Sequence, residues 1–301
     1  MLFVLSFLAV LAFMATRSVA TAEAASDGVA VQLAVTVQAT EENILANQVF
    51  LVWQQLNQAR SNPRQTMSRL GISEDSARAA LGQDAWILDQ ALPPLALNNQ
   101  LVASAAGHGR DMLDHLYYSE VSPSGYTLAQ RVAATGYEAA FEGESLSAMV
   151  FQNLVSMEMA VGAMVDTMLR DELTVGSGVR RKIFSSDFSE VGVGFLAESV
   201  ALLDGKPYVY LLVVDCAQPV VPRYFVVGTI GGAVERVMVK NRYTGFWTSA
   251  VIFPGKAYQF QLSVEGEDIV VQDSGNNVLF QGSTQGVLPG RNYYLELGAG
   301  L

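Results

Sequence analysis

The fold of this chain is decided by four short pieces of sequence: AAGHGRDM at residues 105–112, YYSEVSPSG at 117–125, GES at 143–145 and FSEVGVG at 188–194. The first piece lies in a helix predicted over 97–116. The second is a loop, because Ser, Pro and Gly favour turns. After Glu190 the pattern changes to strands, and a hairpin is predicted from 195–203 and 208–214, with Asp204-Gly205 as its turn.

In this order and spacing the four pieces resemble the bacterial branch of the CAP family, also called SCP-like or pathogenesis-related-1-like domains. The resemblance covers roughly residues 41–217. It implies the α+β class, as an α-β-α sandwich in which helices flank an antiparallel sheet. The family builds one cleft from two glutamates and two histidines. The resemblance implies that Glu144 and Glu190 fill the glutamate positions, while Glu120 and Val179 replace the histidines.

The replaced histidines change the metal chemistry expected of this cleft. Zinc favours imidazole and thiolate ligands, so we expect no zinc site. Carboxylates suit hard cations, so one hypothesis is a weak Ca²⁺ or Mg²⁺ site at Glu120, Glu144 and Glu190. Without a cation, one of these carboxyl groups would keep a proton. In the alternative interpretation the cleft is structural: Glu144 and Glu190 hydrogen-bond nearby backbone, Glu120 faces solvent, and His108 packs against the sheet or a loop.

Helical segments are also predicted on both sides of the cleft residues. One helix is expected from residue 41 to Asn62-Pro63, because proline disfavours helix at the residue before it. Two short helical pieces are expected within 64–92. A short helix over 126–135 and a longer one over 156–173 complete the set, and the longer one carries a methionine stripe that is typical of core.

The amino-terminal residues resemble a secretory signal. Residues 2–15 form an apolar run that only Ser6 interrupts, shorter than the roughly 20 residues that span a membrane. We therefore predict a signal peptide over 1–25, with an uncleaved N-terminal anchor as the alternative, and a strand within 26–40. The chain is then secreted or periplasmic in a bacterium, either free or retained by that anchor, with no transmembrane span in the mature protein.

The carboxy-terminal part is predicted to be a second, all-β domain. Residues 218–222 read QPVVP and are interpreted as a linker. Residues 223–301 alternate like strands, lack a helical pattern and contain a weak repeat between 253–262 and 288–297. About seven short strands predict a small β-sandwich. This part resembles the carboxypeptidase-regulatory or prealbumin-like modules that are appended to some bacterial CAP proteins.

Composition excludes some functions. The 301 residues are half hydrophobic, so a large core is expected. The net charge of −11 makes nucleic acid a poor partner, because phosphates would be repelled. Cys216 is the single cysteine, so an intramolecular disulfide is excluded. At the end of an apolar run, it is expected to be a buried hydrophobe.

Three functions fit these patterns. The leading interpretation is a secreted, non-catalytic module that binds an apolar small molecule, an envelope glycan or a protein in a cleft without histidine ligands. The cleft would contain Glu120, Glu144, Val179, Glu190 and His108. The second is a hydrolase, either peptidase or glycosidase, with Glu144 or Glu190 as its general base. The third is a surface adhesion protein whose β-sandwich presents aromatic residues; the candidates there are Tyr243, Trp247, Tyr258, Tyr293 and Tyr294.

Overall fold

The structure is a computed structural model that describes residues 47–174, 181–199, 208–232, 234–253, 256–263, 266–284 and 290–297. The predicted signal peptide, the strand within 26–40, Val179 and the Asp204-Gly205 turn lie outside these residues. Helices and strands are both abundant, so the predicted α+β class is confirmed.

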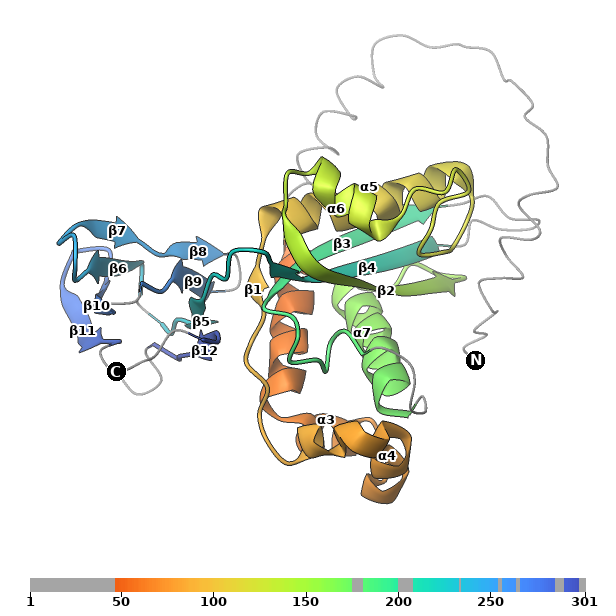
Figure 1. The fold of residues 1–301 in the computed structure, drawn as a ribbon, viewed down its shortest axis with the longest axis horizontal. Helices are drawn as coiled ribbons and strands as arrows, with labels where there is room; N and C mark the ends of the chain where they lie inside the picture. The colour runs from red at the N-terminus through yellow and green to blue at the C-terminus, as the bar shows by residue number, and fades with distance from the viewer. Residues whose placement is uncertain are drawn as a thin grey trace, which may run out of the picture.

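One four-stranded sheet organises the first part of the chain, in the order β1-β3-β4-β2. Its strands are β1 (Ala96–Leu97), β2 (Ala139–Phe151), β3 (Glu190–Ser199) and β4 (Tyr208–Pro219). β1 runs parallel to β3, and the other pairs are antiparallel. Figure 1 shows α5 (Asn99–His115) and α6 (Leu128–Ala134) on one face, with α7 (Met157–Thr174) and the helix over 47–61 on the other.

The remaining helical pieces follow the predicted order. α3 (Pro63–Arg69), α4 (Glu74–Leu81) and the 3-10 helix η1 (Gly82–Leu88) fill the segment predicted to hold two short pieces. Asn62 caps α3, whose first residue is Pro63. α6 begins with a capping box between Thr127 and Gln130. Local capping therefore sets these helix starts, at Pro63 rather than within 64–92 and at Leu128 rather than at 126.

Several elements differ from the sequence predictions, among them β3, which starts at Glu190 rather than at 195. α5 starts at Asn99 rather than at 97, because Leu97 belongs to β1 and Asn98 caps the helix. β2 was not predicted, since its polar residues give it no clear apolar pattern. β4 is longer than 208–214 and continues through Pro219, so it includes the first two residues of the segment interpreted as a linker.

The close contact between α5 and β3 depends on two glycines of the FSEVGVG piece. A Cβ atom at Gly192 would lie 2.0 Å from the carbonyl carbon of Leu101, and one at Gly194 would lie 2.5 Å from that of Ala105. Both neighbours are helix backbone, which cannot turn aside as a side chain can. Glycine at these positions therefore lets α5 lie directly against β3.

The carboxy-terminal part forms two four-stranded sheets, in the orders β11-β10-β6-β7 and β12-β5-β9-β8. The strands are β5 (Phe225–Thr229), β6 (Arg236–Asn241), β7 (Trp247–Ser249), β8 (Val251–Phe253), β9 (Ala257–Gln261), β10 (Glu267–Gln272), β11 (Val278–Ser283) and β12 (Tyr293–Tyr294). Residues of both sheets, such as Val237 and Tyr258, share one core cluster. The likeness to particular β-modules stays a prediction.

The two parts of the chain share buried polar contacts. The side-chain amide of Gln259 in β9 both accepts from Leu97 N and donates to Leu97 O, at 2.9 Å each. Asn292 Nδ2 donates to the carbonyls of Pro94 and Ser189 at 3.0 and 2.6 Å. Figure 1 shows the two sheets of the second part beside β1. The residues that meet in this contact, which we call the joint, lie more than 100 positions apart in the sequence.

We predict that Gly192→Ala destabilises the protein by about 3 kcal/mol or more, because α5 must move away from β3. The matched control is Gly162→Ala in α7, where nothing lies within 4 Å of the new Cβ atom. That change should be neutral or stabilising by up to about 1 kcal/mol. Chemical unfolding of both variants measures the difference. Equal stability of the two variants would contradict the proposed role of Gly192.

Candidate functional site

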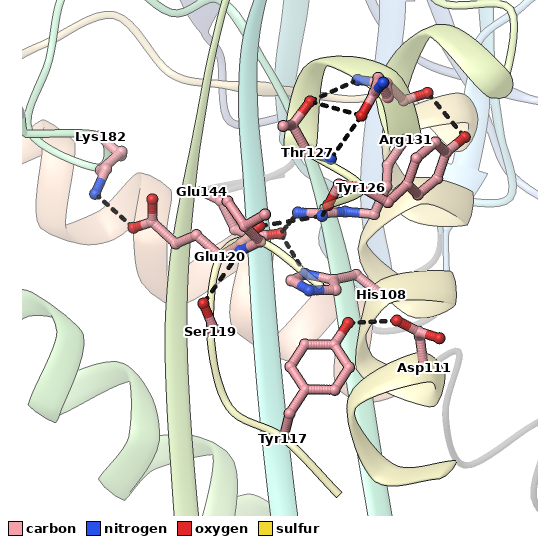
Figure 2. Close-up of polar contacts among 12 residues, drawn as sticks. His108, Asp111, Tyr117, Ser119, Glu120, Tyr126, Thr127, Arg131, Glu144 and Lys182 are labelled. Carbon is pink, nitrogen blue, oxygen red and sulfur yellow. Dashed lines mark hydrogen bonds and ion pairs between the residues drawn. The ribbon is translucent and has the colours of Figure 1, made fainter. Parts of the chain in front are cut away.

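The centre of the site is a buried contact between α5 and β2 (Figure 2). His108 Nδ1 lies 2.7 Å from Glu144 Oε1. Arg131 of α6 donates from Nη2 to the same oxygen at 2.8 Å. Its other terminal nitrogen donates to the carbonyls of Glu120 and Tyr126 at 3.1 and 3.2 Å. Side chains from α5 and α6, up to 36 residues from Glu144 in the sequence, therefore meet at one oxygen of its carboxylate.

The imidazole in this network is neutral at neutral pH. Burial, together with the nearby positive charge of Arg131, lowers the pKa of His108 from 6.5 to about 4. A neutral ring that faces a carboxylate oxygen through Nδ1 carries its proton on that nitrogen. His108 therefore donates from Nδ1 to Glu144 Oε1.

Asp215 of β4 is a fourth member that the sequence analysis did not identify. It is directly opposite Glu144 in the register of the sheet, so the two side chains leave the same face. Asp215 is fully buried. Burial raises its pKa well above the usual range, and burial also raises the pKa of Glu144 to about 7. One proton shared by the pair leaves a single negative charge, which Arg131 balances.

Two hollows adjoin this network. The first, which we call the cleft, has a volume of about 340 Å³ and includes Glu144 in its wall. Its other lining residues include Tyr118, Ser119, Glu120, Leu146, Met168 and Lys182. The second hollow has about 460 Å³ and lies at α5 and α6, with His108 and Arg131 in its wall. Ser104, Ser122, Ser124, Tyr126 and Gln130 also line it.

Glu120 lies at the exposed rim of the cleft. Its side chain is 60% exposed and forms an ion pair with Lys182 at 3.5 Å. Its negative charge contributes to raising the pKa of Glu144, although burial is the larger cause. The cleft therefore combines an exposed charged rim with a buried carboxyl pair behind it.

Glu190 belongs to a separate network. It is completely buried, and Arg223 donates from Nε and Nη2 to its two oxygens at 3.0 Å each. Asn98, the cap of α5, adds a hydrogen bond of 2.6 Å. Burial raises the pKa of Glu190 despite these partners. Glu190 and Glu144 leave the same face of the sheet, but β4 lies between their strands.

The predicted site residues are therefore only partly brought together. Glu120 and Glu144 line the cleft and His108 contacts Glu144 from the second hollow, whereas Glu190 is part of the joint with the second part of the chain. Val179 lies outside the described residues. Within the described ranges, no three His, Cys, Asp or Glu side chains are placed to hold a metal ion. Cys216 is buried, and burial raises the pKa of its thiol far above the usual range.

We predict that Asp215→Asn makes stability less dependent on pH between 6 and 8.5. A carboxyl group whose pKa is raised by folding contributes stability that is present below its unfolded pKa and lost as pH rises through the folded value. The native pair should lose about 1–3 kcal/mol of stability as pH rises through 7. His108 has the opposite sign: its lowered pKa costs stability only as pH falls from 6.5 towards 4.

In the Asp215→Asn variant the second negative charge never forms, so the loss of stability between pH 6 and pH 8.5 should be smaller. Urea unfolding at pH 6 and pH 8.5 measures it. Asp187→Asn, on an exposed residue, serves as the control. An alkaline loss as large in Asp215→Asn as in the native protein would show that the carboxyl pair is not its source.

We predict that Arg223→Met costs about 2–4 kcal/mol, because the buried Glu190 keeps only Asn98 as a partner and loses the positive charge that balances it. Arg69→Met is the control, since Arg69 pairs with Asp166 on the surface and should cost less than about 1 kcal/mol. Adding Glu190→Gln to Arg223→Met should recover part of the loss. Thermal unfolding of the variants tests this; similar losses in the two single variants would contradict it.

No helix of the described residues is long and apolar enough to cross a membrane. The model of the Cysteine-rich secretory protein family, abbreviated CAP, matches residues 53–201. None of the curated proteins matches this chain.

Two solved structures are similar to this chain. One is an extracellular protein containing an SCP domain from Bacillus anthracis, 26% identical with a TM-score of 0.25, over 40% of this chain and 34% of that one. This chain thus spans about a third of its length. The other is an outer surface protein from Borrelia burgdorferi, 14% identical with a TM-score of 0.29, over 52% of this chain and 93% of that one. The family model covers the helices and strands that carry His108, Arg131 and Glu144, so residues 53–201 of this chain form a CAP domain.

Proposed function

We propose that this chain is an exported bacterial protein whose CAP domain binds a small, largely apolar ligand without chemical change. The observation that carries this proposal is the state of the two candidate general bases. Glu144 is 1% exposed and Glu190 is completely buried, and each is paired with an arginine. A general base must come within hydrogen-bond reach of its substrate. Arg223 instead occupies both oxygens of Glu190, and Arg131 and His108 hold Oε1 of the buried Glu144.

The cleft supplies the binding site in this proposal. Its volume of about 340 Å³ falls in the usual range of small-molecule sites, about 300–1,000 Å³. Tyr118, Leu146 and Met168 offer apolar surface, and the ion pair between Glu120 and Lys182 marks the rim. This combination suits a ligand with an apolar body and one polar end. An envelope glycan or a protein segment is the alternative partner for the same cleft.

The hydrolase interpretation keeps one favourable feature, the pKa of Glu144 near 7, which is where a general base works best. Its geometry argues the other way. Oε1 already accepts from Arg131 and contacts His108, and Asp215 lies opposite on the neighbouring strand. Oε2 is buried as well, so the surrounding residues would have to move before Glu144 could reach a substrate.

We predict that the neutral fluorescent probe N-phenyl-1-naphthylamine binds the protein and that Ser119→Trp weakens this binding at least tenfold. The new indole would fill the cleft from its exposed loop. Ser124→Trp is the matched control, because Ser124 lies in the same loop but lines the second hollow. Fluorescence titration measures both affinities. Equal binding by the native protein and Ser119→Trp would reject the cleft as the site.

The non-catalytic part of the proposal has its own test. Peptide and oligosaccharide mixtures incubated with the native protein should be recovered unchanged. Cleavage by the native protein that disappears in Glu144→Gln would replace the binding role with the hydrolase, whatever the probe shows.

A further inference from the structure

The turn between β6 and β7 presents three large aromatic side chains to solvent. Tyr243 is 80% exposed, Phe246 is 74% exposed and Trp247 is 47% exposed. Hydrogen bonds within the turn hold it in place: Asn241 Oδ1 accepts from Thr244 N at 2.8 Å, and Asn241 N donates to Phe246 O at 3.0 Å. We call residues 241–247 the aromatic tip. Three exposed aromatics in five positions are a concentrated apolar surface on a structured turn.

These three side chains are not part of the hydrophobic core of their own sheets. That core is filled by other residues, among them Tyr258, Phe260 and Val239. Of the aromatic residues proposed from the sequence for an interface, Tyr258 is therefore core, whereas Tyr243 and Trp247 are at the surface. Aromatic rings that lie outside the core and remain exposed are the residues that binding would bury.

Positive charge accompanies the tip. Lys240 is directly opposite Trp247 in the β6–β7 register, and its ammonium group lies 5.7 Å from the centre of the indole ring. Arg242 follows, paired with Asp268 at 2.7 Å. Lys240 and Arg242 therefore lie beside the three rings, Asp268 pairs with Arg242, and the carboxylate of Glu267, opposite Asn241 in the β6–β10 register, is buried.

Charge is divided unevenly along the chain. Residues 223–301 hold six Lys and Arg against six Asp and Glu, whereas residues 1–222 hold twelve against twenty-three. The whole net charge of −11 therefore lies in the first part. Near an anionic surface the first part is repelled and the neutral second part is not. The molecule would approach such a surface with its carboxy-terminal sheets leading.

We propose that the aromatic tip docks on an anionic lipid membrane. Phe246 enters the acyl boundary, and Tyr243 and Trp247 lie at headgroup level, where amphipathic rings are favoured. Lys240 and Arg242 face the lipid phosphates, each adding attraction that salt screens. The CAP domain, with its cleft, is held on the solvent side of the membrane.

The test is sedimentation of the full chain with vesicles. The tip variant is Tyr243→Ser with Phe246→Ser and Trp247→Ser. The control variant is Leu154→Ser with Met159→Ser and Val221→Ser, three comparably exposed apolar residues away from the tip. Any contribution of the amino-terminal apolar run is the same in all three proteins. With vesicles of phosphatidylglycerol and phosphatidylcholine, we expect the tip variant to bind at least tenfold more weakly and the control variant to bind like the native chain.

Two further measurements identify the surface. Brominated lipids should quench Trp247, and Trp247→Phe should remove that quenching while Trp53 and Trp86 remain. Lys240→Glu should weaken binding to the anionic vesicles and leave binding to pure phosphatidylcholine unchanged. Equal vesicle binding by the native and tip variants would overturn the proposal. So would tip-dependent binding to an acidic polysaccharide with none to vesicles, which would make the tip a glycan-binding surface.

Discussion

The close approach of α5 to β3 is the constraint on which the CAP-domain site depends. Gly192 and Gly194 remove the Cβ atoms that would otherwise meet helix backbone at 2.0 and 2.5 Å. With the helix this close to the sheet, His108 reaches Glu144 across to β2. The helix also covers Asp215 on β4, the strand that lies between β3 and β2. The FSEVGVG piece therefore contributes to the site through packing, because its glycines let α5 lie close to the sheet.

Once the helix covers these groups, their protonation follows from burial. A lone buried carboxylate is costly, so Glu144 is paired with Arg131, and Asp215 beside it retains a proton rather than adding a second charge. His108 stays neutral for the same reason. A network with one cation and one anion has little charge left for a substrate. In our proposal this balance makes the carboxyl group with the raised pKa part of the fold rather than a general base.

The CAP fold and most helices could be predicted from the sequence, because they depend on local patterns and on a family-like order of motifs. The same order of motifs made Glu144 and His108 candidate site residues. Their contact was not foreseen, since nothing local links residues 36 positions apart. Asp215 was missed although a signal exists: a single carboxylate after the apolar run 209–214 must find a partner when buried. Arg223 was also missed, because its partner Glu190 was predicted to be a cleft residue.

The joint between the two parts of the chain explains why Glu190 is not available to the cleft. A carboxylate on the first residue of β3 is stabilised by Arg223, which lies beyond β4, and by Asn98 at the start of α5. Gln259 and Asn292 satisfy backbone groups of the CAP domain from the other side of the joint. Each of these buried groups would be left without its partner if the parts separated, at a cost for each. Polar pairing at the joint therefore fixes the direction of the carboxy-terminal sheets relative to the cleft, and with it the direction in which the aromatic tip points.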